Sequence, residues 1–204
     1  MRDCVGFILA GGLARRMGGG DKPLAETAGR PILQHVIDRL KPQCAALAIN
    51  ANGDPARFSA FGLPVVADSV EGFAGPLAGV LAGMDFAAET GATDVLSAPG
   101  DTPFLPADLL SRLEAARNQA GADIAVAASD ARIHHAVALW PVALREDLRR
   151  ALVDEGERKV SAFIARFANV VVDWPVEPYD PFFNVNRPED LARAEAIAKD
   201  GSRG

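Results

Sequence analysis

Short apolar runs alternate with amphipathic segments along the chain, and this alternation is the main structural signal in the sequence. Apolar runs of strand length cover residues 5–10, 45–50, 64–67, 93–98 and 123–128. Between several of these runs, the spacing of apolar residues predicts helices that begin at Pro31, Pro76 and Pro106. Strands that alternate with helices are typical of βαβ units, which place parallel strands side by side.

The second half of the chain keeps the alternation but mixes its order. The pattern predicts strands over 135–140 and 170–174, helices over 142–153 and 158–167, and a last helix that begins at Pro188. A chain of 204 residues with short connections suits one domain. We therefore expect an α/β fold, a single-domain three-layer α/β/α sandwich that spans residues 1–204 and has a mostly parallel sheet.

The segment after the first strand, residues 11–23, combines five glycines with three cations, Arg15, Arg16 and Lys22. Glycines let the backbone bring N–H groups against an anion, and the cations add charge where a triphosphate would lie. Pro23 excludes two common nucleotide motifs, because a P-loop needs Ser or Thr after the lysine and a Rossmann fingerprint needs glycine at that position. An ordinary basic connection is the alternative interpretation.

Polar residues follow several of the predicted strands where these end. Asn50, Asp68 and Asp101 stand at three such positions. Because ligands of open parallel sheets bind beyond the carboxyl ends of the strands, we expect these residues near a nucleotide, with Asp101 as a candidate ligand for Mg²⁺. The alternatives are turn or cap roles for Asn50 and Asp68, and capping of the next helix by Asp101.

Net charge and composition narrow the class of partner. The formal net charge of −6 argues against a nucleic acid, which needs an extended basic surface. The content of 49% hydrophobic residues, with only short apolar runs, predicts no association with a membrane. The N-terminus leads directly into a strand, without the pattern of a secretory signal peptide. We expect a cytoplasmic protein. Cys4 and Cys44 lack metal-ligand spacing and are expected as buried thiols.

Four motifs carry a resemblance to a known family. Residues 9–23 match L-A-G-G-x3-R-M-G-x3-K-P, a signature of nucleotidyltransferases, and residues 75–79 look like their G-P-L-A-G element. Residues 182–191 and 156–160 resemble motifs of the molybdenum cofactor guanylyltransferases. The resemblance extends from Leu9 to Leu191. It implies a nucleotide-diphospho-sugar transferase-like fold with a Rossmann-like nucleotide-binding half over about residues 1–105 and an acceptor-binding half over about 106–200.

The activity that the resemblance implies is transfer of the guanylyl group of Mg·GTP to the phosphate of molybdopterin, or of its molybdenum-bound form, with release of pyrophosphate. Cofactor-delivery proteins and molybdoenzymes are the further partners that it suggests. Catalytic residues would be Arg16, Lys22 and Asp101, and the metal ligand Asp101. Nucleotide-binding residues would be Leu9, Ala10, Gly11, Gly12, Lys22, Asn50, Asp68, Gly79 and Asp101. Acceptor-binding residues would be Arg158, Asn184 and Asn186.

Several of these assignments have a simpler alternative. Gly79 could admit a flat base, or it could let a helix pack closely on the sheet together with Gly83. Asn184 and Asn186 would point to one face if their segment is extended, but turns also favour asparagine. Arg158 could bind phosphate bidentately or lie at a solvated helix start.

Histidines offer no metal site, since strand alternation places His134 and His135 on opposite sides.

Two other functions remain open at this stage. A cytidylyltransferase that acts on the same pterin would share the early loop, because the sequence does not reveal the hydrogen bonds that choose the base. A non-catalytic nucleotide-binding regulator would be expected to lose the metal carboxylate, yet Asp101 is present. A glycosyltransferase is disfavoured because Asp101 is not part of an Asp-x-Asp motif.

Overall fold

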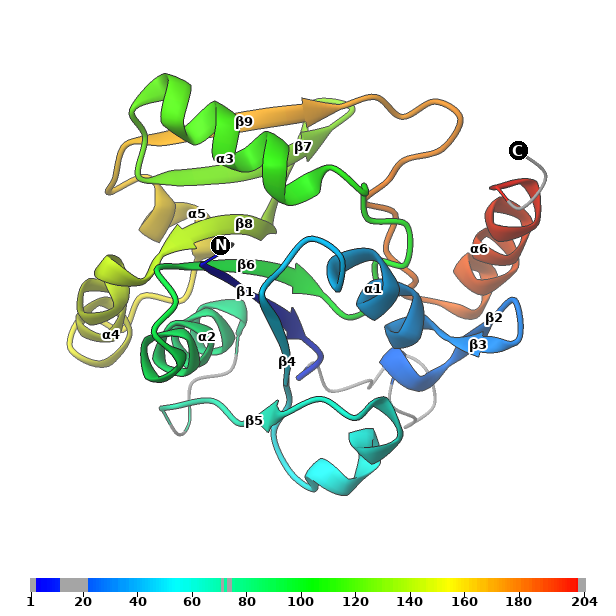
Figure 1. The fold of residues 1–204 in the computed structure, drawn as a ribbon, viewed down its shortest axis with the longest axis horizontal. Coiled ribbons are helices and arrows are strands. Elements are labelled where there is room, and N and C mark those ends of the chain that lie inside the picture. The colour runs from blue at the N-terminus through cyan, green and yellow to red at the C-terminus, as the bar shows by residue number, and fades with distance from the viewer. Residues whose placement is uncertain (1–2, 12–21, 71, 73–74, 202–204) are drawn as a thin grey trace.

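A twisted seven-stranded sheet forms the middle layer of the molecule (Figure 1). The computed structural model describes residues 3–11, 22–70, 72 and 75–201. Across the sheet the strands follow the order β5 (Val65–Val66), β4 (Ala46–Asn50), β1 (Cys4–Leu9), β6 (Asp94–Pro99), β8 (Arg132–Pro141), β7 (Ile124–Ser129) and β9 (Asn169–Trp174). The predicted α/β class with a mostly parallel sheet is confirmed.

Strand β8 is antiparallel to both of its neighbours, β6 and β7. Only two residues, Asp130 and Ala131, separate β7 from β8, and both have positive φ angles of 47° and 58°. Paired positive φ angles are typical of the tight turns that join antiparallel strands, whereas a parallel crossover needs a dozen or more residues. The sequence pattern predicts a strand over 135–140, and the hairpin extends it back to Arg132.

Helices cover both faces of the sheet. Residues of α1 (Ile32–Leu40) and α3 (Leu109–Ala120) belong to one buried cluster, and residues of α2 (Pro76–Thr90), α4 (Arg145–Val153) and α5 (Val160–Ile164) belong to the other. Strand residues divide between these clusters by alternation: Ile8 of β1 packs with the first cluster and Phe7 with the second. The three-layer α/β/α arrangement is therefore confirmed.

A smaller apolar cluster attaches the C-terminal helix α6 (Pro188–Gly201) beside α1 and the two-residue strands β2 (Glu26–Thr27) and β3 (Arg30–Pro31) (Figure 1). It contains Ile32, Phe104, Val185 and Ala194. The apolar pattern does not predict the β2–β3 pair, because two-residue strands are too short to show a period. The C-terminal helix thus packs against the segment of the chain that leads into α1.

The remaining boundaries differ from the predictions by a few residues. Three short 3-10 helices cover Lys22–Leu24, Pro55–Phe61 and Val142–Leu144. The helix predicted from Pro106 begins at Leu109, and the one predicted over 158–167 narrows to α5. Cys4 is a buried free thiol, whereas Cys44 is half-buried. No helix in the part of the chain that the structure describes is long and apolar enough to cross a bilayer.

Register places the carboxyl ends of three strands at one level. Leu9 pairs with Asn50 of β4 and with Pro99 of β6. The ladder continues one step further, since the Ala10 N–H donates to the Asn50 carbonyl at 2.9 Å and the Gly100 N–H donates to the Leu9 carbonyl at 2.9 Å. Polar residues that follow these strands therefore emerge along one edge of the sheet.

Candidate functional site

Asn50 lies at the centre of the predicted nucleotide side of this edge. Its side chain is 4% exposed, and its Nδ2 donates to Asp68 Oδ1 at 3.0 Å and to the Val66 carbonyl at 3.2 Å. Asn52 Nδ2 donates to the other carboxylate oxygen of Asp68 at 2.8 Å, and Asn52 Oδ1 accepts the Asp68 N–H at 2.9 Å. The Asp68 carboxylate is thus oriented by two amides, a role that simple turn chemistry does not describe.

Gly79, on the first turn of α2, packs directly against this cluster. A Cβ at Gly79 would lie 2.5 Å from Asn50 Oδ1 and 2.8 Å from Leu9 Cδ2, so no larger residue fits without movement. A Cβ at Gly83, one turn later, would lie 2.8 Å from ring atoms of Phe7. Close packing of α2 on the sheet therefore explains both glycines, and the approach of a base at Gly79 stays a prediction.

Most of the predicted nucleotide-binding residues that the structure describes lie around Asn50. Gly11 is close enough that a Cβ there would lie 3.7 Å from Asn50 Oδ1, and Ala10 bonds the Asn50 carbonyl. Gly12 and Arg16 fall outside the described residues, and so does the side chain of Lys22. Their predicted contacts with phosphate stay predictions.

Asp101 lies two residues after the end of β6 and contacts Asn184, which is 83 residues away in the sequence. Its Oδ1 accepts from Asn184 Nδ2 at 2.8 Å, and its carbonyl accepts the Val185 N–H at 2.9 Å. Asn184 Nδ2 also lies 3.2 Å from Thr102 Oγ1. The residue at the cap position of α3 is Asp108, so the alternative that Asp101 caps this helix is wrong.

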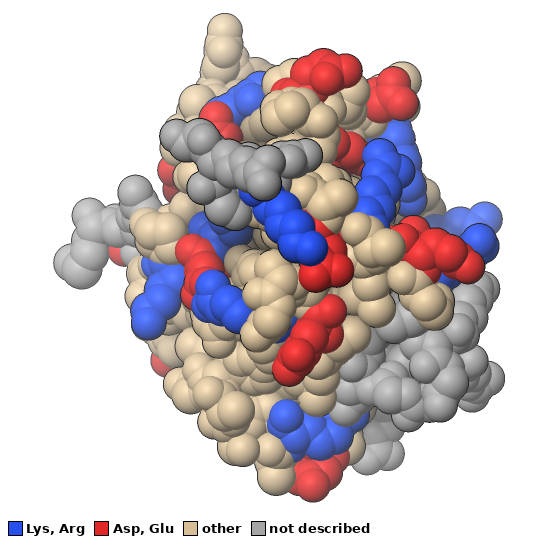
Figure 2. All heavy atoms as spheres, turned by 90° about the vertical axis from the view of Figure 1, so that its right-hand side faces the viewer, with Lys and Arg blue, Asp and Glu red and all other residues tan. Residues whose placement is uncertain are grey.

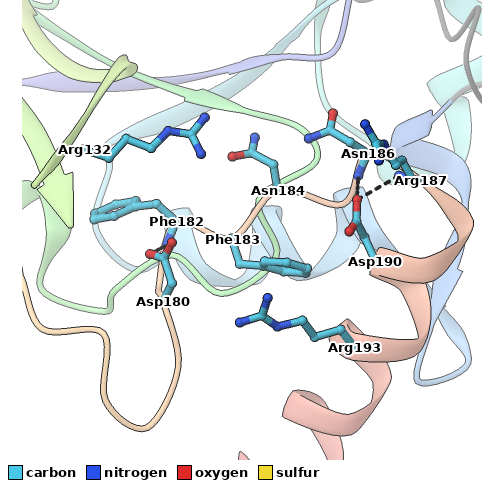
Figure 3. Close-up of a pocket in the computed structure, with 9 residues that line it drawn as sticks. All are labelled: Arg132, Asp180, Phe182, Phe183, Asn184, Asn186, Arg187, Asp190 and Arg193. Carbon is cyan, nitrogen blue, oxygen red and sulfur yellow. Dashed lines mark hydrogen bonds between the residues drawn. The ribbon is translucent and has the colours of Figure 1, made fainter. Parts of the chain in front are cut away.

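A cavity of about 530 Å³ opens beside Asn184 (Figure 3). Its lining consists of Arg132, Asp180, Phe182, Phe183, Asn184, Asn186, Arg187, Asp190 and Arg193. The predicted acceptor residues Asn184 and Asn186 therefore line one cavity, although residues 183–186 form an irregular segment and no strand. The Asp190 carboxylate fixes the end of this segment by accepting the N–H groups of Asn186 and Arg187 at 2.8 and 2.9 Å.

A buried polar network holds the start of the segment that carries Asn184, and the sequence analysis did not predict this network. Ser129 Oγ lies 2.8 Å from His134 Nε2 and donates to Asp180 Oδ1 at 2.8 Å, and Asp180 Oδ1 also accepts the Phe182 N–H at 2.9 Å. The centroids of the His134 and Phe182 rings lie 4.8 Å apart, and the two rings are tilted by 37°. Burial lowers the pKa of His134, and Asp180 opposes this effect. The network fixes the backbone two residues before Asn184.

Arg158, the third predicted acceptor residue, lies between α4 and α5 and is not part of the cavity lining. Its guanidinium donates to the carbonyls of Leu152 and Glu157, each at 3.4 Å. The Glu157 carboxylate accepts the N–H groups of Lys159 and Arg158 at 2.9 Å, and these bonds lower the pKa of Glu157. A role of Arg158 toward the acceptor stays a prediction.

The Asp101 carboxylate is the type of ligand that Mg²⁺ binds, but it supplies only one such group. A carboxylate is a hard oxygen ligand, and Mg²⁺ is commonly held by one or two carboxylates with phosphate and water oxygens completing the shell. Among the described residues, no group of three or more His, Cys, Asp or Glu side chains gathers as a metal site. A magnesium ion at Asp101 would therefore depend on the phosphates of a bound nucleotide.

Polar groups lie at the carboxyl ends of β4 and β6, and the hydrogen bond between Asp101 and Asn184 links this edge to the cavity. This arrangement is typical of a nucleotide-dependent transferase. The comparisons with known proteins agree. Residues 6–170 match the family described as MobA-like NTP transferase domain. The chain belongs to this family and is a nucleotidyltransferase.

Two relatives that match nearly the full length of this chain carry the same name. The chain is 63% identical over 198 residues to "Molybdenum cofactor guanylyltransferase" of Rhodopseudomonas palustris strain BisB5, covering 96% of this chain and 94% of that one. It is 61% identical over 194 residues to the protein of the same name from strain HaA2, covering 94% and 91%. The predicted resemblance to molybdenum cofactor guanylyltransferases is confirmed.

A solved structure shares the fold. Molybdopterin-guanine dinucleotide biosynthesis protein A from Archaeoglobus fulgidus superposes with a TM-score of 0.72 at 25% identity, covering 97% of this chain and 99% of that one. The nucleotidyltransferase fold class inferred from the sequence is thus confirmed.

Proposed function

We propose that this protein transfers GMP from GTP to the terminal phosphate of molybdopterin, giving the guanine dinucleotide form of the cofactor and pyrophosphate. The hydrogen bond between Asp101 and Asn184 is the observation that carries this proposal. It joins the strand edge that holds the predicted nucleotide residues to the polar cavity predicted for the acceptor. A transferase of this kind needs two substrates to meet at one point, and Asp101 lies at that point.

Each side of the edge has a separate task in this proposal. Asn50, Asp68 and Gly79 bind the nucleoside, with Asn50 and Asp68 fixed by their mutual hydrogen bond. The glycine-rich loop with Arg16 and Lys22 binds the triphosphate through backbone N–H groups and cationic side chains. Binding of this kind lowers the barrier mainly by positioning and by neutralising charge.

Asp101 holds Mg²⁺ in this scheme, and Asn184 orients the carboxylate by donating to Oδ1. The ion, when bound, neutralises charge that develops on the phosphate oxygens. The acceptor phosphate attacks the α-phosphate of GTP in line, a new P–O bond forms, and the bond to the β-phosphate breaks with pyrophosphate as the leaving group. Because a phosphate monoester is already ionised at neutral pH, the reaction needs no strong general base.

The names of the relatives support guanine as the base and molybdopterin as the acceptor. The cytoplasmic location and the protein partners expected from the sequence remain part of this proposal.

Purified protein with Mg²⁺, molybdopterin and each nucleoside triphosphate in turn tests the proposal, with pyrophosphate release and the mass of the pterin product as readouts. We expect a guanine dinucleotide from GTP alone. Asp101→Asn keeps an oxygen that accepts from Asn184 but removes the charge, and should lower the rate about a hundred- to thousandfold. Asp147→Asn, an exposed change on α4, is the control.

Formation of a cytosine dinucleotide from CTP would keep the chemistry and refute the choice of base. Tight GTP binding without turnover for any nucleotide would instead favour a nucleotide-binding regulator.

A further inference from the structure

Two arginines stand on opposite rims of the acceptor cavity. Arg132 comes from the turn of the β7–β8 hairpin, and Arg193 comes from the second turn of α6. Figure 3 shows Arg132 reaching toward Asn184 from one side, while Arg193 extends beneath the ring of Phe183 from the other. The β7–β8 hairpin, α6 and the segment that carries Asn184 thus all contribute to one polar cavity.

The charge of these two arginines is not neutralised within the part of the chain that the structure describes, where neither side chain forms an ion pair. Many other arginines of this acidic protein do contact carboxylates, among them Arg30, Arg117, Arg145, Arg149 and Arg166. Figure 2 shows acidic and basic side chains interleaved over the face that carries α6, with no broad basic surface.

The two acidic residues of the cavity offset only part of the positive charge of its lining, which also includes Arg187, and each is held by hydrogen bonds to the protein through one oxygen. Asp180 Oδ1 accepts from Ser129 Oγ and from the Phe182 N–H. Asp190 Oδ2 accepts two backbone N–H groups at the start of α6. These bonds hold both carboxylates in place, and within the described residues neither carboxylate forms an ion pair with Arg132 or Arg193.

The position of Arg193 is partly fixed. Its Cζ lies 4.8 Å from the centroid of the Phe183 ring, within the range of a cation–π interaction. Such a contact restrains the long side chain while its N–H donors stay available for a ligand. Arg132 is positioned by its place directly after the tight turn at Asp130 and Ala131.

We propose that Arg132 and Arg193 are specificity-determining residues that bind an anionic acceptor in this cavity, on either side of Asn184. The inference rests on the proposed function and adds to it the residues that select a phosphorylated, oxygen-rich acceptor over a neutral one. Guanidinium groups bind phosphate oxygens with charge-assisted, frequently bidentate hydrogen bonds. The acceptor would lie between the two arginines, with its phosphate toward Asn184 and Asp101.

Steady-state kinetics of Arg132→Gln and Arg193→Gln, with molybdopterin and GTP varied separately, tests this inference. We expect the KM for molybdopterin to rise about tenfold in each variant, as for the loss of one charge-assisted contact, while the KM for GTP stays unchanged. The lysine variants should recover part of the loss, because lysine keeps the charge but not the fork. Arg150→Gln, an exposed change on α4, is the matched control.

Binding of molybdopterin without GTP, followed by pterin fluorescence, separates this inference from the proposed function. Binding that weakens in both glutamine variants supports the arginine site even if wild-type protein makes no dinucleotide. Unchanged binding and unchanged KM in both variants overturn the arginine site while turnover in wild type upholds the function. A wild-type protein that does not bind molybdopterin overturns both.

Discussion

Substitution of Gly79 by alanine should separate the packing role of α2 from its role beside the nucleotide. The added Cβ would lie 2.5 Å from Asn50 Oδ1, closer than any normal contact. Either α2 moves away from the sheet or the Asn50 amide rotates, and rotation breaks its 3.0 Å hydrogen bond to Asp68. We therefore expect Gly79→Ala to disturb both the stability and the predicted nucleotide site.

The expected loss of stability follows from two costs and one gain. Overpacking of a core costs about 1–3 kcal/mol, and alanine in place of glycine within a helix returns about 1 kcal/mol. Loss of the bond from Asn50 to the half-exposed Asp68 carboxylate adds roughly 1 kcal/mol. The net destabilisation is about 2 kcal/mol, which lowers Tm by about 4–8 °C in a chain of this size.

Gly83→Ala is the matched control, because the same substitution on the same helix meets the Phe7 ring at 2.8 Å instead of Asn50. It should cost stability, by about 1 kcal/mol after the gain in helix propensity, without a change in the KM for GTP. Gly79→Ala should raise that KM about tenfold, equivalent to about 1.4 kcal/mol of lost binding.

Thermal unfolding and initial rates with varied GTP measure both effects. If the two variants lose stability alike and keep the wild-type KM for GTP, Gly79 serves packing alone and the reasoning from Asn50 to the nucleotide is refuted.

Three further predictions concern the buried polar groups. Ser129→Ala leaves His134 and Asp180 without their shared hydroxyl, so the free energy of unfolding, measured with denaturant, should fall by about 1–3 kcal/mol. The KM for molybdopterin should rise while the KM for GTP stays the same. Equal changes in the two KM values would contradict a role limited to the acceptor segment. Burial lowers the pKa of His134 in the folded protein, so the unfolded chain binds a proton at this histidine at a higher pH than the folded chain does. The free energy of unfolding should therefore stay constant above pH ~6.5 and fall as the pH drops below that value. The fall should be less steep in His134→Gln than in His135→Gln. Asn50→Asp places a buried carboxylate beside Asp68, so Tm should fall more at pH 8 than at pH 5, and an equal loss at both would argue against charge repulsion.

Much of the framework could be predicted from the sequence because it depends on local patterns. Runs such as residues 5–10 and 93–98 form buried strands, and the apolar spacing over α1 specifies which face of that helix is covered. Parallel strands place their carboxyl ends at one edge, so Asn50, Asp68 and Asp101 could be expected together from strand order alone.

Other features depend on contacts between segments far apart in the chain. No local pattern indicates that Asp101 bonds Asn184 across 83 residues, or that Ser129, His134 and Asp180 form one network. Sequence reasoning left His134 without a role because a histidine on a strand reveals nothing about what packs over it.

The sequence by itself determined most of the elements, the class of fold and the family, since periodicity and motif spacing are properties of neighbouring residues. Only the tertiary structure decided which interpretation of Gly79 has physical support and which arginines face the acceptor cavity. It placed Arg132, Arg187 and Arg193 in the lining of that cavity, which does not include Arg158. The reason is that a side chain's partners are set by the packing of distant elements, and burial and hydrogen bonding act only once these elements have met.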